Sequence, residues 1–215
     1  MKIVSAVLGA AAIAMIYYGA VCFLNQKLSL QLPENGITDK FVLSVGIVTF
    51  AVWCYLGSRE SAYQSVFETL QNMVILLAMS VFSVTDVKAK LIPNRVVLIF
   101  LGIWSVIATG AVFSDFERGL ALIGQSIIGG MVGGLIFLLC YLVSRGQLGA
   151  GDVKLAFVMG LYLTGQRIVG AIAYGVLVCC ACSLVQMARK RLTMKDGVPL
   201  APFLYLGTLI TFLII

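Results

Sequence analysis

The amino-acid sequence predicts an all-α protein, a polytopic bundle of about eight transmembrane helices that forms one integral-membrane domain over residues 1–215. Apolar residues make up 61% of the chain, against roughly 45–50% in a typical soluble domain. Charged residues make up only 11%, and the mean hydropathy is +1.06. A soluble globule of this size cannot bury so much apolar surface, because a large share of its residues must face water. The same composition excludes intrinsic disorder and a coiled coil.

Eight apolar stretches approach the length that a membrane-spanning helix needs, which is about 20 residues. The first is longer than the apolar region of a signal peptide and no small-residue cleavage site follows it, so we expect an anchor. The sixth is the weakest, because it is short and carries Asp152 and Lys154 in its first turn. In chain order, the expected spans are Ile3–Leu24, Phe41–Gly57, Thr69–Thr85, Val96–Phe113, Gly119–Val143, Ala150–Leu163, Ile168–Ala188 and Leu200–Ile215.

The basic residues predict how these spans are oriented. With the N-terminus outside, eight spans leave only Lys2, Arg59, Arg118 and Arg167 on the outer side, and the remainder of the 15 lysines and arginines lie on the cytoplasmic side. This asymmetry follows the positive-inside rule. Omitting the sixth span would move four further basic residues outside, so we retain it. Topology thus accounts for the net charge of +6, and we expect no nucleic-acid partner.

The side-chain inventory limits the chemistry. The chain has no histidine, which excludes Ser-His triads and HExxH zinc sites. All six cysteines lie in apolar stretches, where cysteine behaves as a small buried residue. The run Cys179-Cys180-Ala181-Cys182 lacks the spacing of a CxxC ligand pair, so we expect no metal and no cofactor. Paired glycines at 129–130 and 133–134 are typical of closely packed membrane helices.

Two of the nine acidic residues stand apart from the others. Asp86 and Asp152 adjoin apolar segments on the expected cytoplasmic side, whereas the other seven fall in loops or at loop edges. An ionisable group at the edge of a span is a functional candidate. Both aspartates begin the pattern Asp-Val-Lys, completed by Lys88 and Lys154. Each could simply pair with its own lysine as a membrane-edge anchor, but two such sites at one face favour a functional pair.

A facing pair of carboxylates has a definite chemistry. The two groups share one proton, because two negative charges at close range repel each other. One carboxylate can then act as a base toward water while the other donates a proton to a scissile carbonyl. Local sequence is consistent with this role: Gly149 and Gly151 allow close backbone approach beside Asp152. Pro93-Asn94, after Asp86, predicts a turn before the next helix.

Three segments carry a resemblance to a known family. Gly149-Ala150-Gly151-Asp152 is a G-x-G-D motif, Asp86 is followed by Lys90-Leu91-Ile92-Pro93-Asn94, and Val198 to Phe203 contains Pro199 and Pro202. In this order they resemble the two aspartate motifs and the proline-rich opening of the last helix in the type IV prepilin peptidases, which include archaeal preflagellin relatives. The resemblance covers the chain from about Gly19 to Gly207.

The resemblance implies a membrane aspartyl protease whose catalytic residues are Asp86 and Asp152. Its substrate would be a prepilin-like protein with a short basic leader and an apolar N-terminal helix, cleaved at the cytoplasmic face of a prokaryotic plasma membrane. Membrane lipid would be the other partner, and the oligomeric state stays open. The residues expected to support the site or bind substrate are Lys88, Pro93, Asn94, Gly149, Gly151, Lys154, Pro199 and Pro202.

One departure from the family concerns a second activity. Long members carry two CxxC pairs after the first helix and also methylate the new N-terminus. The corresponding loop here, from Asn25 to Lys40, contains no cysteine. We therefore expect a short form without that zinc site and without N-methyltransferase activity.

Two other functions remain open. An ion-coupled transporter also uses intramembrane carboxylates, but it would place them near the midplane within two matching halves. A non-catalytic membrane scaffold would keep the glycine-rich packing faces and tolerate loss of either aspartate. The position of both aspartates at one face favours the peptidase.

Overall fold

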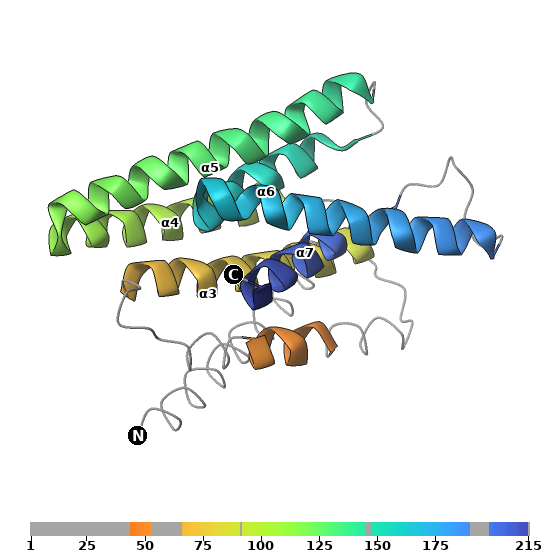
Figure 1. Ribbon diagram of the computed structural model, residues 1–215, viewed down its shortest axis with the longest axis horizontal. Helices are drawn as coiled ribbons and strands as arrows, with labels where there is room; N and C mark the ends of the chain where they lie inside the picture. Colours follow the sequence, from red (N-terminus) through yellow and green to blue (C-terminus); the bar gives the residue numbers. More distant parts are fainter. Residues whose placement is uncertain (1–43, 53–65, 91, 145–147, 190–197, 215) are drawn as a thin grey trace.

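The computed structural model describes residues 44–52, 66–90, 92–144, 148–189 and 198–214 (Figure 1). Every regular element in these ranges is helical, which confirms the predicted all-α class. The expected span Ile3–Leu24 and the cysteine-free loop after it lie outside the described residues. Of the second expected span, residues 44–52 are described and are helical.

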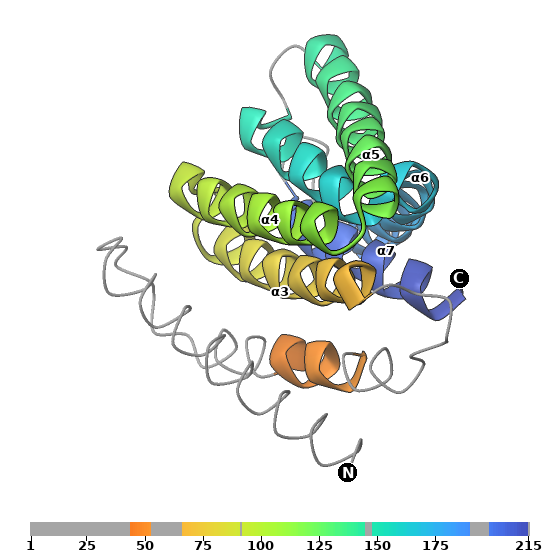
Figure 2. The same cartoon turned by 90° about the vertical axis from the view of Figure 1, so that its left-hand side faces the viewer.

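The labelled helices pass back and forth along one axis, and α3, α4 and α5 are successively antiparallel (Figures 1 and 2). We call the end at which α3 finishes and α4, α6 and α7 begin the aspartate end; it lies to the right in Figure 1. In chain order the helices are α3 (Val66–Ala89), α4 (Asn94–Ser114), α5 (Phe116–Val143), α6 (Ala150–Ala188) and α7 (Ala201–Ile214).

The described helices confirm a bundle of membrane type. Four stretches are long and apolar enough to cross a bilayer: Val66–Val87, Asn94–Ser114, Phe116–Val143 and Arg167–Ala188. The expected span Ala150–Leu163 is not among them, and α7 has only 14 residues. The predicted count of about eight is therefore approximate, because apolar segments shorter than about 20 residues complete the bundle without the length of a full span.

Helix α3 forms the centre of the bundle. It contacts α4, α6 and α7. In its most apolar stretch 67% is buried inside the bundle, against 22–33% in the other three candidate spans. Ile75, Leu76 and Phe82 on this helix are completely buried. Helix α3 is thus surrounded by protein along most of its length, and Asp86 near its end is 7% exposed.

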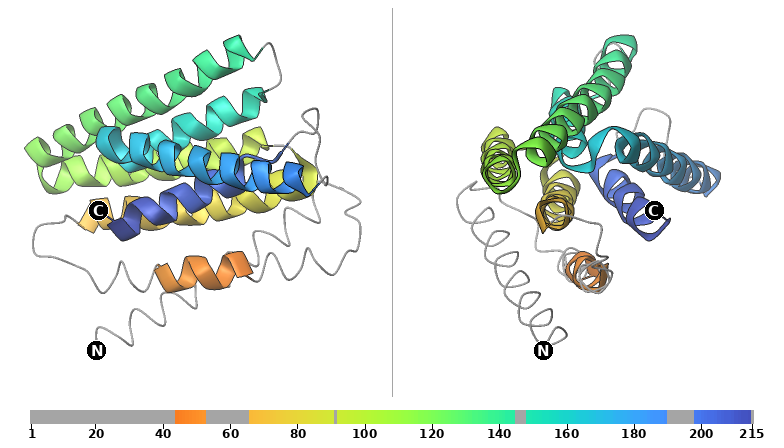
Figure 3. Two further views of the ribbon diagram at one scale, coloured as in Figure 1. Left: turned by 45° about the vertical axis from the view of Figure 1, so that its right-hand side comes forward. Right: turned by 60° about the vertical axis from the view of Figure 1, so that its left-hand side comes forward.

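Helix α6 is broken at Thr164, where the backbone adopts φ 63° and ψ 174°. This conformation is almost reserved for glycine, and it costs a threonine about 1–3 kcal/mol. The first half of α6 runs back along α5, and the second half reverses direction (Figures 1 and 3). The reversal agrees with the prediction of two separate segments, Ala150–Leu163 and Ile168–Ala188.

The glycine pairs of α5 take part in close helix packing, as predicted, and the structure shows that their partner is the first half of α6. A Cβ on Gly133 would lie 2.6 Å from the carbonyl oxygen of Ala156, and one on Gly129 would collide with the carbonyl oxygen of Gly160. Only glycine permits backbones to approach so closely. This contact fixes the first half of α6, and with it Asp152, against the rest of the bundle.

Candidate active site

Asp86 lies in the last turns of α3 and is 7% exposed. Its Oδ2 accepts a hydrogen bond of 2.9 Å from the backbone N–H of Ala201, the first residue of α7. The sequence predicted that Asp86 follows a span ending at Thr85, whereas the helix continues to Ala89. The helix continues because Asp86 is covered by α7 and does not need to leave the bundle for water.

The first turn of α7 explains how Asp86 is held. Pro202 is the second residue of α7 and has no N–H, and Phe203 donates its N–H to the carbonyl of Leu200. The N–H of Ala201, in the first turn of α7, has no acceptor within its own helix and is available to the carboxylate. The positive end of the α7 dipole also favours a negative charge there, which offsets the unfavourable position of Asp86 near the C-terminus of its own helix.

Asp152 is half-buried in the first turn of α6. Its Oδ2 accepts a hydrogen bond of 3.3 Å from the N–H of Gly149, which caps this helix. Leu155, Ala156 and Met159, at three, four and seven residues further on, are completely buried. Because residues at this spacing share one face of a helix, Asp152 faces the interior of the bundle.

The two aspartates influence each other. Asp152 lies outside the four candidate spans, and its pKa is raised from 3.8 to about 6, chiefly by burial and then by the negative charge of Asp86. The hydrogen bond from Gly149 acts in the opposite direction and lowers this pKa. The fold therefore brings within electrostatic range two carboxyl groups that are 66 residues apart in the chain.

The residues between α3 and α4 pack on the start of α6, where the G-x-G-D motif lies. Lys90, just after α3, has φ 49° and turns the chain, and Pro93 precedes the first residue of α4. A Cβ on Gly151 would lie 3.1 Å from the Cβ of Ile92. Lys154 Nζ donates a hydrogen bond of 2.9 Å to Asn94 Oδ1.

Most of the predicted supporting residues therefore gather at the aspartate end. Pro93, Asn94, Gly149, Gly151 and Lys154 connect the two motifs or cap their helices, as described above. Pro199 and Pro202 flank the first residue of α7. Lys88 is part of α3, but its side chain lies outside the described residues. Neither Asp86 nor Asp152 forms an ion pair with Lys154, whose described partner is Asn94.

Two contacts were not predicted. The Ala201 amide was overlooked because a backbone N–H leaves no mark in the residue types, although the proline after it was a usable signal. Ile92 was treated only as part of a motif, yet it is buried against Gly151. Within the described ranges, no three His, Cys, Asp or Glu side chains gather closely enough to hold a metal ion.

The fold and the candidate site together indicate a class of protein: a helical membrane protein with two neighbouring carboxyl groups at one end of its bundle. The chain belongs to the type IV leader peptidase family, which matches residues 73–184 and confirms the predicted family. Both aspartates lie inside the matched range.

A curated relative points in the same direction. The prepilin leader peptidase/N-methyltransferase of Bacillus subtilis (strain 168) is 25% identical over 167 residues, which make up 78% of this chain and 63% of that protein. The chain therefore spans less than two-thirds of the length of that relative. No solved structure matches the chain.

Proposed function

We propose that this chain is a membrane aspartyl endopeptidase that removes the short basic leader of prepilin-like proteins, with Asp86 and Asp152 as its catalytic residues. The observation that carries the proposal is the pairing of these two aspartates, from distant helices, within electrostatic range at one end of the bundle. Membership of the leader peptidase family supports the same class of reaction.

The surroundings of the two aspartates suggest how they divide the work. Asp86, which accepts the N–H of Ala201 at the positive end of α7, acts as the ionised base. It takes a proton from a water molecule, whose oxygen attacks the carbonyl carbon of the scissile peptide bond. Asp152 donates its proton to the carbonyl oxygen. The tetrahedral intermediate then breaks its C–N bond. The proton held by Asp86 passes to the departing amine, and one hydroxyl proton of the intermediate returns to Asp152 as the new carboxyl group forms.

The remaining features of the proposal concern membrane and substrate. We expect a single peptidase domain in the plasma membrane of a prokaryote, with lipid around it, the N-terminus outside and the aspartate end at the cytoplasm. The substrate would carry an apolar helix directly after its basic leader. We expect no N-methyltransferase activity, because the loop from Asn25 to Lys40, which lies outside the described residues, contains no cysteine.

The test is co-expression with a cognate prepilin, with leader removal followed as a gel shift and the cut site fixed by mass spectrometry. Asp86→Asn and Asp152→Asn should each lower the cleavage rate by at least about 10²-fold, because each removes one half of an acid–base pair. Asp115→Asn is the matched control, since Asp115 caps α5 at the opposite end of the bundle. That variant should cleave like the parent.

Other outcomes would contradict the proposal. A rate near that of the parent in either Asp86→Asn or Asp152→Asn would exclude the paired mechanism. If the parent cleaves none of the cognate prepilins, a transporter or a scaffold would be favoured. The mass of the mature product would also reveal a methyl group, which would refute the expected loss of methyltransferase activity.

A further inference from the structure

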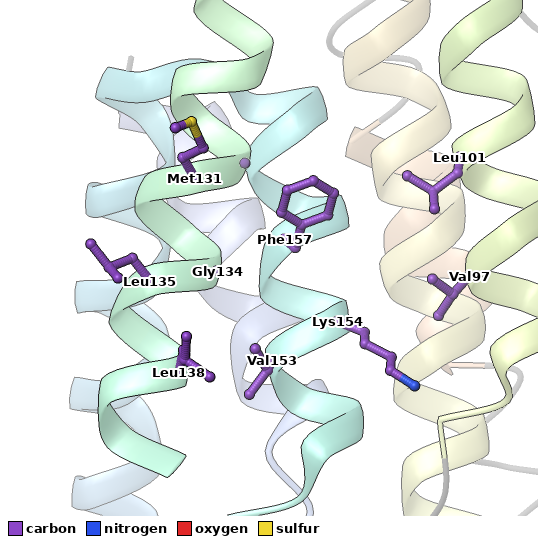
Figure 4. A pocket seen from close by; sticks show the side chains of 10 residues that line it. Val97, Leu101, Met131, Gly134, Leu135, Leu138, Val153, Lys154 and Phe157 are labelled. Atoms are coloured by element: carbon purple, nitrogen blue, oxygen red, sulfur yellow. The ribbon is translucent and has the colours of Figure 1, made fainter. Parts of the chain in front are cut away.

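A groove runs along the outside of the bundle between α4 and α5, with the first half of α6 as its floor (Figure 4). Its volume is about 600 Å³. All its lining side chains except that of Lys154 are apolar. Met131, Leu135 and Phe157 in its lining are 60%, 57% and 38% exposed, so the groove opens laterally from the bundle.

The groove has a direction. Gly134 of α5 lies against Phe157 of α6 and Gly130 against Leu161, so the two helices are antiparallel along it. Leu138 and Val153 are therefore at one end, and Met131 is toward the other (Figure 4). From Gly130 to Leu138 the lining of α5 extends over about 12 Å at 1.5 Å per residue. That length accommodates about two turns of a neighbouring helix.

One end of the groove meets the candidate active site. Val153, on the floor, directly follows Asp152 in the chain. Lys154 marks the polar limit of the groove, where its ammonium group reaches Asn94 at the start of α4. An apolar occupant would therefore lie in the groove with one end beside the turn of α6 that carries Asp152.

We propose that this groove is the docking site for the apolar helix of the substrate. The inference rests on the proposed function and adds where the substrate binds. Its basis is the continuity of an apolar, laterally open channel with the residue next to Asp152. A helix in a bilayer can enter such a channel sideways without leaving the apolar phase, so its backbone stays satisfied throughout.

The position of the groove also predicts where the substrate is cut. Asp152 directly precedes Val153, so the two side chains point about 100° apart around the helix axis. Val153 lines the groove, whereas Asp152 faces the interior of the bundle. A docked substrate must therefore cross the start of α6 to reach the carboxylate. Gly149 and Ala150 are exposed there and have no bulky side chains to block it. We expect the cleaved bond to lie just outside the docked helix, in a segment that is extended.

Photo-crosslinking in membranes tests the location. The inactive Asp152→Asn chain carries p-benzoyl-phenylalanine at position 131 or 138 in the groove, or at the control positions 177 and 184 on the exposed face of α6. With co-expressed prepilin, positions 131 and 138 should crosslink to the substrate much more strongly than 177 and 184. Equal or stronger crosslinks at the control positions would overturn the proposal.

A matched pair of variants tests the function of the groove. Leu138 and Leu139 are adjacent, exposed leucines of α5, but only Leu138 lines the groove. Leu138→Trp should lower kcat/KM for prepilin by about tenfold, mainly through KM, because the indole fills the docking space. Leu139→Trp should retain at least about half of the parental kcat/KM.

The results separate the two proposals. If the parent cleaves prepilin but the groove positions neither crosslink nor respond to tryptophan, the groove proposal fails and the proposed function stands. A crosslink of position 138 to lipid alone in that setting would identify the groove as a lipid site and refute docking. If the parent cleaves no cognate prepilin, both proposals fail together.

Discussion

At the scale of single residues, the two aspartates differ in what holds them. Asp86 accepts a hydrogen bond of 2.9 Å from a backbone N–H at the start of another helix. Asp152 accepts a hydrogen bond of 3.3 Å from the backbone N–H of the residue that caps its own helix. Burial disfavours a negative charge on both aspartates, and Asp86 is the more buried of the two, at 7% exposed. The charge of Asp86 in addition disfavours a negative Asp152. The different hydrogen bonds of the two carboxylates are therefore the physical basis for the proposed assignment of the proton to Asp152.

The asymmetry predicts a pH dependence of cleavage. The pKa of Asp152 is about 6, above its ordinary value of 3.8, so the folded protein holds this proton over a pH range in which a solvated aspartate has lost it. As the pH rises through 6, Asp152 loses this proton and can no longer act as the general acid. We therefore expect kcat to fall between pH 5.5 and 7.5, measured on detergent-solubilised enzyme with prepilin as substrate.

Two observations decide whether this pH dependence belongs to Asp152. Intrinsic fluorescence at each pH should show that the protein stays folded, which excludes unfolding as the cause. A kcat that is constant from pH 5.5 to 7.5, or that rises through this range, would contradict the assignment of the proton to Asp152.

At the scale of elements, the contact between α5 and α6 holds the aspartate pair together. Gly129 and Gly133 let the first half of α6 lie directly on α5, and the break at Thr164 lets the chain return. Without this contact the short segment Ala150–Leu163 would have little reason to lie inside the bundle, because it is too short for a full span. The glycines thus act on the site from a distance.

A pair of glycine substitutions tests this role. Gly133→Ala places a Cβ 2.6 Å from the carbonyl oxygen of Ala156 and should destabilise the protein by about 1–3 kcal/mol through forced displacement of α6. Gly124→Ala, on the same helix, meets nothing within 4 Å and should be neutral or stabilising by up to about 1 kcal/mol. Thermal unfolding in detergent measures both changes.

The prediction for α5 has a clear failure. If Gly133→Ala melts at or above the temperature of Gly124→Ala, the close contact with α6 does not stabilise the protein. A loss of cleavage in Gly133→Ala without a loss of stability would instead indicate that α6 has shifted at the aspartates while the bundle stayed intact.

At the scale of the whole molecule, the basic residues divide between the two ends of the bundle. Among the residues described, Arg95, Lys154 and Arg189 belong to helix ends at the aspartate end. Arg118 and Arg167 lie near the opposite end, at the start of α5 and beside the break in α6. By the positive-inside rule, the aspartate end should face the cytoplasm.

Reporter fusions test this orientation. Alkaline phosphatase is active only outside the cytoplasm, so a fusion after Asp115, at the opposite end of the bundle, should be active. A fusion after Arg189 should be inactive, and green fluorescent protein should give the reverse pattern. An active phosphatase after Arg189 would place the aspartates outside and contradict the proposed cytoplasmic cleavage.

The sequence predicted the helices better than their ends. Helix α5 was expected to begin at Gly119 but begins at Phe116, because Asp115 accepts the N–H of Arg118 and caps the helix three residues earlier. Helix α3 likewise begins before Thr69 and continues past Thr85. Apolarity marks the part of a helix that lies in lipid, whereas polar caps and buried contacts decide where the helix stops.

The sequence alone determined the class, the order of the helices and the candidate residues. Composition requires a bilayer, and two motifs around Asp86 and Asp152 mark the candidate site, since both are properties of residue type and local spacing. Only the tertiary structure decided that Asp86 lies under the amide of Ala201, that Asp152 faces inward and that a groove ends beside it. Those facts depend on long-range packing of α5, α6 and α7, which the order of residue types does not specify.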